Sequence, residues 1–258
     1  MDEERLPGGN VGGAWRVGET VRRTPGPWTP AVHALLAHLD GRLRGVPRVH
    51  GFDSRGREVL DFLPGCIVDV DSEVLTDAQL ASMVRWTREL HMAVADFAHA
   101  GPWRFFPVDA PSLIGHNDIA PYNAVFDGDE LVGVFDWDFA GPSTPLLELA
   151  FIAWNGVPMW ADIGTALAAH RLELIAGQYG GPSAGAILAA LPGRIQLMLD
   201  GIPLAAAAGD AGMAALVAAG EPERSRTALD ELVLRMPAVA ALLTWVDGPS
   251  RRHRGGLA

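Results

Sequence analysis

The chain has 258 residues, of which 49% are hydrophobic and 20% are charged, and its formal net charge is −11. This composition is that of a globular protein with a sizeable core, and it excludes a fibrous or an intrinsically disordered chain. The acidic balance argues against a nucleic-acid partner, because such a partner requires a basic face. All 20 basic residues are arginine and none is lysine, so any task that commonly needs a lysine falls to an arginine.

The sequence pattern favours a protein that stays in the compartment where it is made. No apolar run approaches the roughly 18 residues that a membrane-spanning helix needs. The first residues, MDEERLPGG, are acidic and lack the apolar core of a signal peptide. The single cysteine, Cys66, cannot form an internal disulfide. We therefore expect a cytoplasmic protein with no membrane partner, and we leave its oligomeric state open.

Residues 1–64 are broken by glycine and proline into short segments, which predicts a small α+β unit. A helix is expected at Thr29–Leu39, with Thr29 as the N-cap and Pro30 in the first helical position. Alternating apolar residues predict four strands around that helix, at Ala14–Val17, Thr20–Arg23, Arg48–Phe52 and Glu58–Leu63.

After Leu63-Pro64-Gly65 the pattern becomes mainly helical, so we place a second unit at 65–258. Its clearest helix is Thr76–Ala98, where apolar residues recur at helical spacing and Thr76 forms a capping box with Gln79. From about Pro145 the sequence predicts four or five further helices. Between these helical stretches lie three short strands, at Leu113–His116, Asn123–Phe126 and Val132–Phe135, with a turn at Asp127-Gly128-Asp129.

The motif that carries chemistry lies among those three strands, at 113–141. It reads His116-x-Asp118-x4-Asn123, and Asp136 follows at the end of the apolar strand LVGVF. Phosphoryl transfer needs a carboxylate that orients the attacking hydroxyl and accepts its proton, together with oxygen ligands for Mg²⁺. Asp118 as base, with Asn123 and Asp136 as ligands, supplies that set. The structural alternative is a turn held by Asx-type hydrogen bonds.

The segments HNDIAPYNAVF and VFDWDFAGPSTPLLELA resemble the catalytic and metal-binding segments of the aminoglycoside phosphotransferase and choline kinase superfamily. The resemblance implies an α+β, two-lobed protein-kinase-like fold with a small β-rich N-lobe and a larger, mostly helical C-lobe. It also implies transfer of the γ-phosphoryl of ATP or GTP to a small-molecule hydroxyl. Carried over, the base is Asp118, the Mg²⁺ ligands are Asn123 and Asp136, and His116 is structural.

Two further carboxylates fall on positions of that family. Asp138 matches a position that is often acidic and would assist a second metal ion, and a solvated or capping carboxylate is the alternative interpretation. Glu148 stands where the family usually has an aspartate that supports the catalytic loop from a helix. The resemblance therefore gives Glu148 a structural role rather than a catalytic one.

The resemblance extends to the N-terminal segment LPGGNVGGAWRVGETVRR. Gly8, Gly9 and Asn10 correspond to the loop where the backbone approaches the nucleotide phosphates. Arg23 corresponds to the basic strand residue that contacts the α- and β-phosphates. Arg22 is expected to point away from them, because neighbouring residues of a strand face opposite sides.

The segment REVLDFLPG resembles the hinge between the lobes. There Leu60 would lie behind the nucleotide base, and the backbone of Asp61 and Leu63 would hydrogen-bond its edge. One feature departs from the kinase-like pattern, in which the basic strand residue pairs with a glutamate from the small-lobe helix. The predicted helix TPAVHALLAHL contains no acidic residue, so either Arg23 binds phosphate without a partner or another carboxylate reaches it.

Two other function classes stay open at this point. The missing helix glutamate favours a catalytically silent kinase-like module that binds a nucleotide or a partner. The same carboxylates would also serve a metal-dependent hydrolase. A serine-hydrolase pattern occurs at Gly181-Pro182-Ser183-Ala184-Gly185. A predicted helix rather than a strand precedes it, so we interpret it as a helix–turn–helix junction.

The acceptor of the phosphoryl group is left open by the residues. The resembling family phosphorylates aminoglycosides, macrolides, choline, homoserine and sugars, so antibiotic resistance is one of several roles. Trp154 and Trp160 follow the catalytic segment and are candidates for lining the acceptor site. Acidic residues near the predicted cleft favour a cationic acceptor: Asp127, Asp129, Glu130, Asp138 and Glu148.

Overall fold

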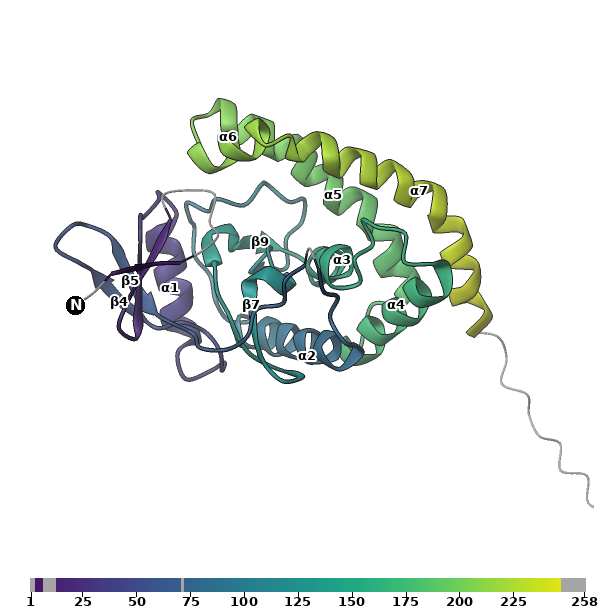
Figure 1. Cartoon of the computed structure of the whole chain (residues 1–258), viewed down its shortest axis with the longest axis horizontal. Coiled ribbons are helices and arrows are strands. Elements are labelled where there is room, and N and C mark those ends of the chain that lie inside the picture. Colours follow the sequence, from purple (N-terminus) through teal and green to yellow (C-terminus); the bar gives the residue numbers. More distant parts are fainter. Residues whose placement is uncertain (1–2, 7–12, 71, 247–258) are drawn as a thin grey trace, which may run out of the picture.

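The computed structural model describes residues 3–6, 13–70 and 72–246. The N-terminal region is an antiparallel five-stranded sheet in the order β1-β2-β3-β5-β4, with helix α1 (Thr29–Leu39) beside it (Figure 1). The four predicted strands are present, and β1 is an additional edge strand. Their bounds are β1 Glu4–Arg5, β2 Ala14–Val17, β3 Thr20–Arg23, β4 Val49–Phe52 and β5 Glu58–Asp61.

Helix α1 has the predicted bounds but a different cap. The N-cap residue is Trp28, and Pro30 lies in the first helical turn. The prediction of Thr29 as N-cap was wrong because its hydroxyl accepts a hydrogen bond from the N–H of Gly26, at 2.9 Å, in the preceding loop. One face of the helix is buried through Ala31, Val32, Leu35, Leu36 and Leu39, which packs it into the main core.

Helix α2 (Asp77–Ala93) begins with the predicted capping box, since Thr76 and Gln79 exchange both hydrogen bonds. The same two side chains also hold the β7–β8 turn, because Thr76 donates to Asp129 at 2.8 Å and Gln79 to the carbonyl of Gly128 at 3.1 Å. The helix ends five residues before the predicted Ala98. Phe97 still packs against the core from a following turn, so its apolar character could not mark the helix end.

The motif at 113–141 lies on two small antiparallel strand pairs. Strand β6 (Leu113–Gly115) pairs with β9 (Gly141–Ser143), and β7 (Ala124–Asp127) pairs with β8 (Glu130–Val134). Two short 3₁₀ turns, η1 (Pro121–Asn123) and η2 (Trp137–Phe139), lead into β7 and away from β8. The loops between these elements carry Asp118 and Asp136.

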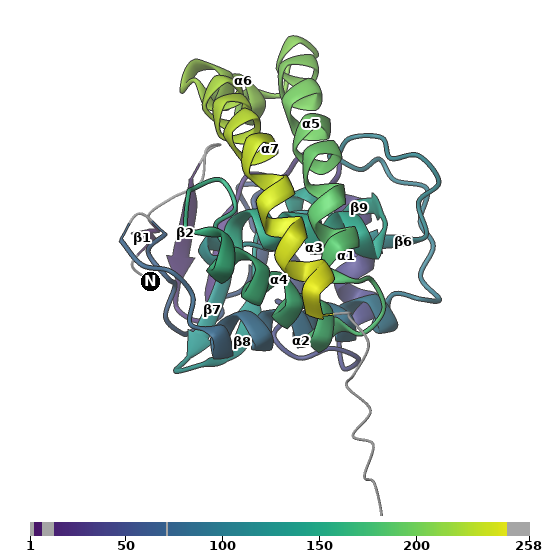
Figure 2. The same cartoon turned by 90° about the vertical axis from the view of Figure 1, so that its right-hand side faces the viewer.

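The described residues after β9 form five helices, which agrees with the predicted four or five. They are α3 (Pro145–Gly156), α4 (Thr165–Tyr179), α5 (Ala184–Ala207), α6 (Ala211–Ala218) and α7 (Glu221–Val246). Helices α5 and α7 run side by side and rise beyond the rest of the molecule, with α6 at their far end (Figures 1 and 2). The helix–turn–helix junction predicted at the G-x-S-x-G pattern is present, because Ser183 is the N-cap of α5 and accepts a hydrogen bond from the N–H of Ala186.

Helix α5 is long and apolar enough, by length and composition, to span a bilayer, which the sequence reading did not anticipate. Its packing is that of a core helix, because it contacts α3, α4, α6 and α7. It also contains a fully buried arginine, Arg194. Within its apolar window, 44% of the residues are buried by these contacts.

The segments just before β4 and just after β5 bond to the β7–β8 hairpin at two points. On one side, the N–H of Val134 in β8 donates to the carbonyl of Gly45 at 2.9 Å. On the other side, Cys66 and Phe126 of β7 exchange two backbone hydrogen bonds of 2.9 and 2.8 Å. Gly45 has a φ of +74°, and a Cβ there would lie 2.6 Å from the carbonyl oxygen of Val132, so this close approach requires glycine.

Candidate active site

Asp118 lies in the loop between β6 and β7, and its carboxylate accepts two side-chain hydrogen bonds. Asn123 donates through Nδ2 to Oδ2 at 2.8 Å, and the Tyr122 hydroxyl donates to Oδ1 at 3.2 Å. Burial of the carboxylate and the nearby negative charge of Asp136 raise the pKa of Asp118 to about 8. A carboxylate whose pKa lies near neutral pH is suited to accept a proton from a reacting hydroxyl. The Tyr122 hydroxyl shows that the Asp118 carboxylate can accept a hydrogen bond from such a group.

Glu148, from the first turn of α3, supports this loop through its backbone. Its buried carboxylate accepts the N–H groups of His116, at 3.1 Å, and of Asn117. Burial alone would raise the pKa of Glu148, but the hydrogen bond and charge of His91 hold that pKa below its usual value. Asn117 has a φ of +63°, so the loop turns sharply where the carboxylate holds it.

His116 joins the Asp118 loop to the strand that precedes Asp136. Its Nδ1 accepts the N–H of Asp118 at 3.2 Å, which leaves Nε2 to donate to the carbonyl of Phe135 at 3.2 Å. Burial lowers the pKa of the imidazole, so the neutral tautomer with the proton on Nε2 fits both contacts. His116 therefore connects the two segments on which Asp118 and Asp136 lie.

Arg194, which the sequence did not single out, contacts the same loop. It lies on α5 with 0% exposure, and its Nη2 donates to the carbonyl of Asn117 at 2.7 Å. The guanidinium lies between the rings of Phe151 and Phe105, at 4.3 and 5.0 Å, and burial lowers its pKa to about 10. An arginine within the apolar run AILAALPGRIQLML was the available signal, because an arginine is rarely buried without a specific partner.

Asp136 follows β8 and adopts a left-handed conformation with φ of +60°. Its side chain is 42% exposed, and its Oδ1 accepts a hydrogen bond from Arg23 Nη1 at 3.0 Å. The adjacent N–H of Phe135 donates to the carbonyl of Asn123 at 3.0 Å. The structure therefore brings together Asp118, Asn123 and Asp136, which the sequence had grouped by spacing.

Asp138 lies between two guanidinium groups. It contacts Arg23, and Arg104 approaches it at 3.4 Å. Arg104 is in turn held by Asp210, the N-cap of α6, through two hydrogen bonds of 2.8 Å. The Arg104 guanidinium also stacks 4.4 Å from the Trp28 ring. Asp138 thus forms ion pairs with Arg23 and Arg104. To bind a metal ion, its carboxylate would have to release one of these two arginines.

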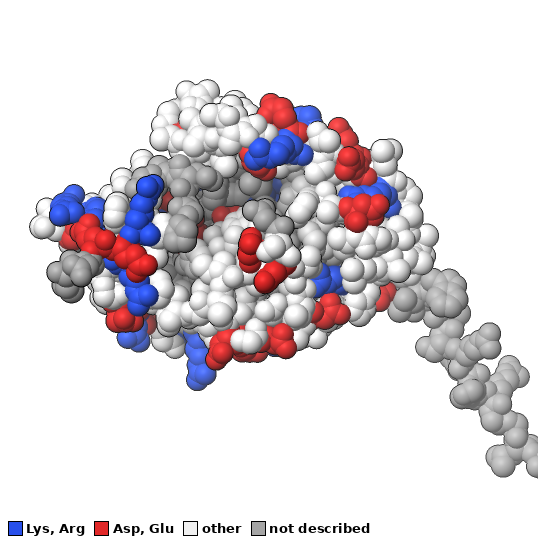
Figure 3. Space-filling view, viewed as in Figure 1, with Lys and Arg blue, Asp and Glu red and all other residues white. Residues whose placement is uncertain are grey.

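Arg23 has the carboxylate partner that α1 lacks. Its Nε donates to Glu58, which lies opposite Arg23 on the neighbouring strand β5. Glu58 also pairs with His33 of α1, at 2.9 Å. The prediction that Arg22 faces away is confirmed, because it contacts Thr20 and Asp53 instead. On that outer face of the sheet, arginines and carboxylates alternate (Figure 3, left).

The other residues predicted for the nucleotide site are those of the 8–10 loop and of the hinge at 60–63. Gly8, Gly9 and Asn10 lie outside the described residues. Leu60 is buried in the core. The N–H of Asp61 donates to the carbonyl of Arg48 at 3.0 Å, which leaves only its carbonyl for a base edge. Leu63 lies two residues after β5, and within the described part of the chain its N–H makes no hydrogen bond.

The donor set fits Mg²⁺ better than a softer metal. Among the described residues, no three His, Cys, Asp or Glu side chains gather as a ligand set. Asp136 and Asn123 supply one partly exposed carboxylate and one amide, and Nδ2 of Asn123 is already used by Asp118. Mg²⁺ characteristically takes one or two protein oxygens and completes its shell with phosphate and water. The amide oxygen of Asn123 and the carboxylate of Asp136 match that requirement.

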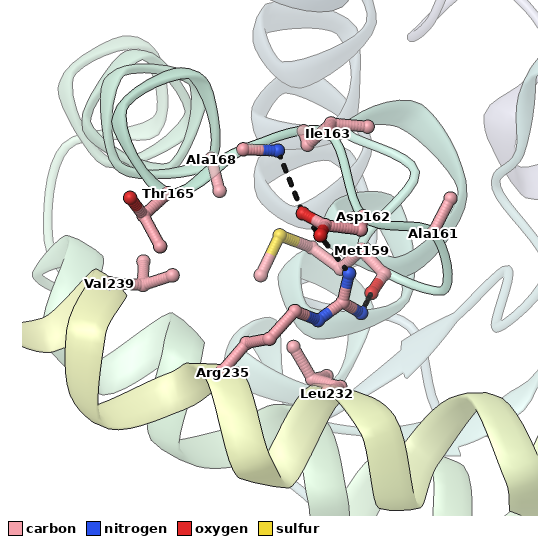
Figure 4. Close-up of a pocket in the computed structure, with 10 residues that line it drawn as sticks. Met159, Ala161, Asp162, Ile163, Thr165, Ala168, Leu232, Arg235 and Val239 are labelled. Atoms are coloured by element: carbon pink, nitrogen blue, oxygen red, sulfur yellow. Dashed lines mark hydrogen bonds and ion pairs between the residues drawn. The ribbon is translucent and has the colours of Figure 1, made fainter.

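Two cavities lie outside the cluster of Asp118, Asn123 and Asp136. The one in Figure 4 lies between the α3–α4 connection and α7, and Arg235 closes it by bonding the carbonyl of Met159 at 3.1 Å. Its volume of about 10 Å³ holds roughly one water molecule. The larger one, about 430 Å³, is lined by Pro107, Val108, Asp109, Thr144, Leu146, Leu147, Gly193 and Leu197. Trp154 is buried in the core, whereas Trp160 is 41% exposed.

A small β-sheet region followed by a helical part that carries the Asp118–Asn123 loop is the architecture of a kinase-like fold. Residues 103–188 match the model of the phosphotransferase enzyme family. The trifolitoxin immunity protein of Rhizobium leguminosarum bv. trifolii is 32% identical over 196 residues, covering 69% of this chain and 74% of that protein. The chain belongs to the phosphotransferase enzyme family and is a small-molecule kinase.

Solved structures share the fold at low sequence identity. The GDP complex of wild-type aminoglycoside 2'-phosphotransferase-IIIa superposes with a TM-score of 0.58 at 15% identity, over 90% of this chain and 93% of that one. A choline/ethanolamine kinase family protein from Mesorhizobium loti gives 0.54 at 19% identity, over 93% and 92%. The two-lobed kinase-like fold and the family resemblance predicted from the sequence are therefore confirmed.

Proposed function

We propose that this protein transfers the γ-phosphoryl of ATP or GTP, together with Mg²⁺, to a hydroxyl group of a small molecule. The observation that carries the proposal is the arrangement of Asp118 with Asn123 and Tyr122 beside the Arg23–Asp136 pair. Solved structures with the same fold include complexes with GDP and with ADP and streptomycin, which supports a nucleotide as co-substrate.

In this mechanism Asp118 orients the acceptor hydroxyl and takes its proton as the oxygen attacks the γ-phosphorus. The bond between the γ-phosphorus and the β–γ bridging oxygen breaks, and the nucleoside diphosphate leaves. Asn123 and Asp136 would hold Mg²⁺, which neutralises charge on the phosphate oxygens when bound. Arg23 contacts the phosphates through the Nη atoms that now face Asp136 and Asp138. Glu148, His116 and Arg194 keep the Asp118 loop in its conformation and touch no reacting atom.

The proposal assigns the two predicted units different tasks. Residues 1–64 would form the nucleotide lobe, with Gly8, Gly9 and Asn10 near the phosphates and Leu60, Asp61 and Leu63 near the base. Residues 65–258 would hold the metal and the acceptor. A cytoplasmic location follows from the need for intracellular nucleotide.

Thermal unfolding with ATP or GTP, with and without Mg²⁺, tests the nucleotide site. A ligand at about 100 times its Kd stabilises the fold by about 2.7 kcal/mol, so a rise of a few degrees is expected. Asp118→Asn should keep that rise and lose turnover. If the wild type binds nucleotide but transfers phosphate to no compound in an acceptor panel, the catalytically silent module is favoured. Mg²⁺-dependent hydrolysis without nucleotide would favour the hydrolase.

A role in resistance is a second proposal, and the immunity relative supports it. We infer that the acceptor is a hydroxyl-bearing antibiotic or toxin rather than a metabolite. Expression in a sensitive bacterial host should raise the inhibitory concentration of at least one compound in a panel of aminoglycosides, macrolides and bacterial toxins. Asp118→Asn should abolish that protection, and an unchanged spectrum for the wild type would contradict it.

A further inference from the structure

Glu58 is a carboxylate in an unexpected place. It opens β5, whose next residues are the buried Val59 and Leu60, and its own exposure is 1%. A buried carboxylate is costly unless its charge is paired and its oxygens are hydrogen-bonded. Burial would raise the pKa of Glu58, yet His33 and Arg23 hold that pKa below its usual value. The site therefore favours the ionised form.

Both oxygens of this carboxylate are used. Oε1 accepts the hydrogen bond from Nε of Arg23, and Oε2 lies 2.9 Å from Nε2 of His33. His33 comes from α1, the helix on which kinase-like folds usually carry the glutamate. Here the helix contributes the imidazole, and the sheet contributes the carboxylate.

The position of the contact on Arg23 determines what the rest of the guanidinium can do. Glu58 takes the Nε side, and the two Nη groups point the other way, to Asp136 and Asp138. A planar guanidinium presents these donors in fixed directions, whereas a lysine ammonium is a single point charge. The strand register that pairs Arg23 with Glu58 therefore sets the direction in which Arg23 donates.

We propose that Glu58, itself held by His33, is the positioning residue that aims Arg23 at the nucleotide phosphates, replacing the helix glutamate of kinase-like folds. This inference rests on the proposed function and names one more requirement of the same site. Glu58 contacts no reacting atom, so its effect passes through Arg23. It follows that Glu58 should contribute nothing to nucleotide affinity once Arg23 is replaced by a residue that cannot make the same contact.

A double-mutant cycle on the full-length protein tests this. The Kd of Mg²⁺ with ATP, and separately with GTP, is measured by calorimetry for the wild type, Glu58→Gln, Arg23→Lys and the double variant. Glu58→Gln should raise Kd at least tenfold while changing kcat much less, and Arg23→Lys should do the same. The double variant should be no worse than the worse single variant, because the two residues act as one unit.

Rescue distinguishes positioning from mere stability. The exchange variant His33→Glu/Glu58→His returns the carboxylate to α1 and should recover Kd to within about threefold of the wild type. The matched control is Asp53→Asn, which neutralises a carboxylate in the β4–β5 turn that pairs with Arg22 and Arg57 and should leave Kd unchanged. Should Glu58→Gln fail to fold, Arg23→Lys and the exchange variant carry the test.

Three results would overturn the inference: wild-type affinity in Glu58→Gln, strictly additive losses in the double variant, or an equal loss in Asp53→Asn. Failure of the wild type to bind either nucleotide would instead remove the proposed function, and the inference with it. The two failures are thus separable from the wild-type measurement alone.

Discussion

Arg194 and Asn117 are 77 positions apart, and the buried guanidinium of Arg194 donates to the carbonyl of Asn117 at 2.7 Å, directly beside Asp118 in the chain. This contact places a fixed positive charge behind the proposed base without exposing it to the cleft. It also makes α5 part of the site, although none of its residues belongs to the recognised motif.

Arg194→Ala should destabilise the protein by about 3 kcal/mol or more. The substitution leaves a cavity between Phe105 and Phe151 and an unpaired buried carbonyl. Urea unfolding followed by circular dichroism measures the loss. The control is Arg226→Ala, on an exposed position of α7, which should stay within about 0.5 kcal/mol of the wild type. Equal effects of the two substitutions would contradict a special role for the buried contact.

Asp118→Asn should stabilise the protein increasingly as pH rises. The pKa of Asp118 is about 8 in the folded state and about 3.9 when unfolded. Between these values the folded state binds one more proton, so this group makes wild-type stability fall from about pH 4 to pH 8. The variant lacks that loss. In EDTA, the advantage of the variant in free energy of unfolding, measured with urea, should grow by at least ~1 kcal/mol from pH 5.5 to pH 9. A difference that stays constant with pH would contradict the raised pKa of Asp118.

Asp136→Asn should abolish the Mg²⁺-dependent part of nucleotide stabilisation while the protein stays folded, since its side chain is partly exposed. The same change removes a negative charge that raises the pKa of Asp118. The pH at which Asp118 titrates should therefore fall. Melting curves with and without Mg²⁺ check the first effect, and carboxyl-selective NMR titration checks the second. An unchanged metal response would exclude Asp136 as a ligand.

Glu148→Gln should loosen the Asp118 loop. An amide can accept one of the two backbone N–H groups but presents a donor to the other, so about 1–3 kcal/mol of stability should be lost. Turnover should fall as well, and the effect on nucleotide affinity should be small. Glu89→Gln, at an exposed position of α2, is the matched control and should change neither quantity. Normal turnover in Glu148→Gln would show that the loop holds its conformation unaided.

The parts of the site that the sequence predicted are those set by short-range spacing. Asp118 and Asn123 are five positions apart across one tight turn, so their contact follows from the local chain. Asp136 required only the expectation that its strand lies next to the one after Asn123. The capping box of α2 is equally local, because Thr76 and Gln79 are three residues apart.

The parts that the sequence could not supply depend on packing between distant elements. Glu58 reaches Arg23 only because β5 pairs with β3 in one particular register, and nothing near Arg23 in the chain indicates that register. Arg194 looks like an ordinary helix charge until α5 is placed behind the Asp118 loop. The N-cap of α1 was predicted wrongly because the Thr29 hydroxyl accepts a hydrogen bond from the N–H of Gly26. That contact depends on the conformation of the preceding loop.

Backbone hydrogen bonds join both edges of the β7–β8 hairpin to the segments just before β4 and just after β5. Gly45 bonds to Val134 near the end of β8, and Cys66 bonds to Phe126 in β7. Asn123 immediately precedes this hairpin, and Asp136 follows it by two residues. Both proposed metal ligands therefore flank this hairpin, so the proposed metal site lies at the junction between the sheet region and the helical part.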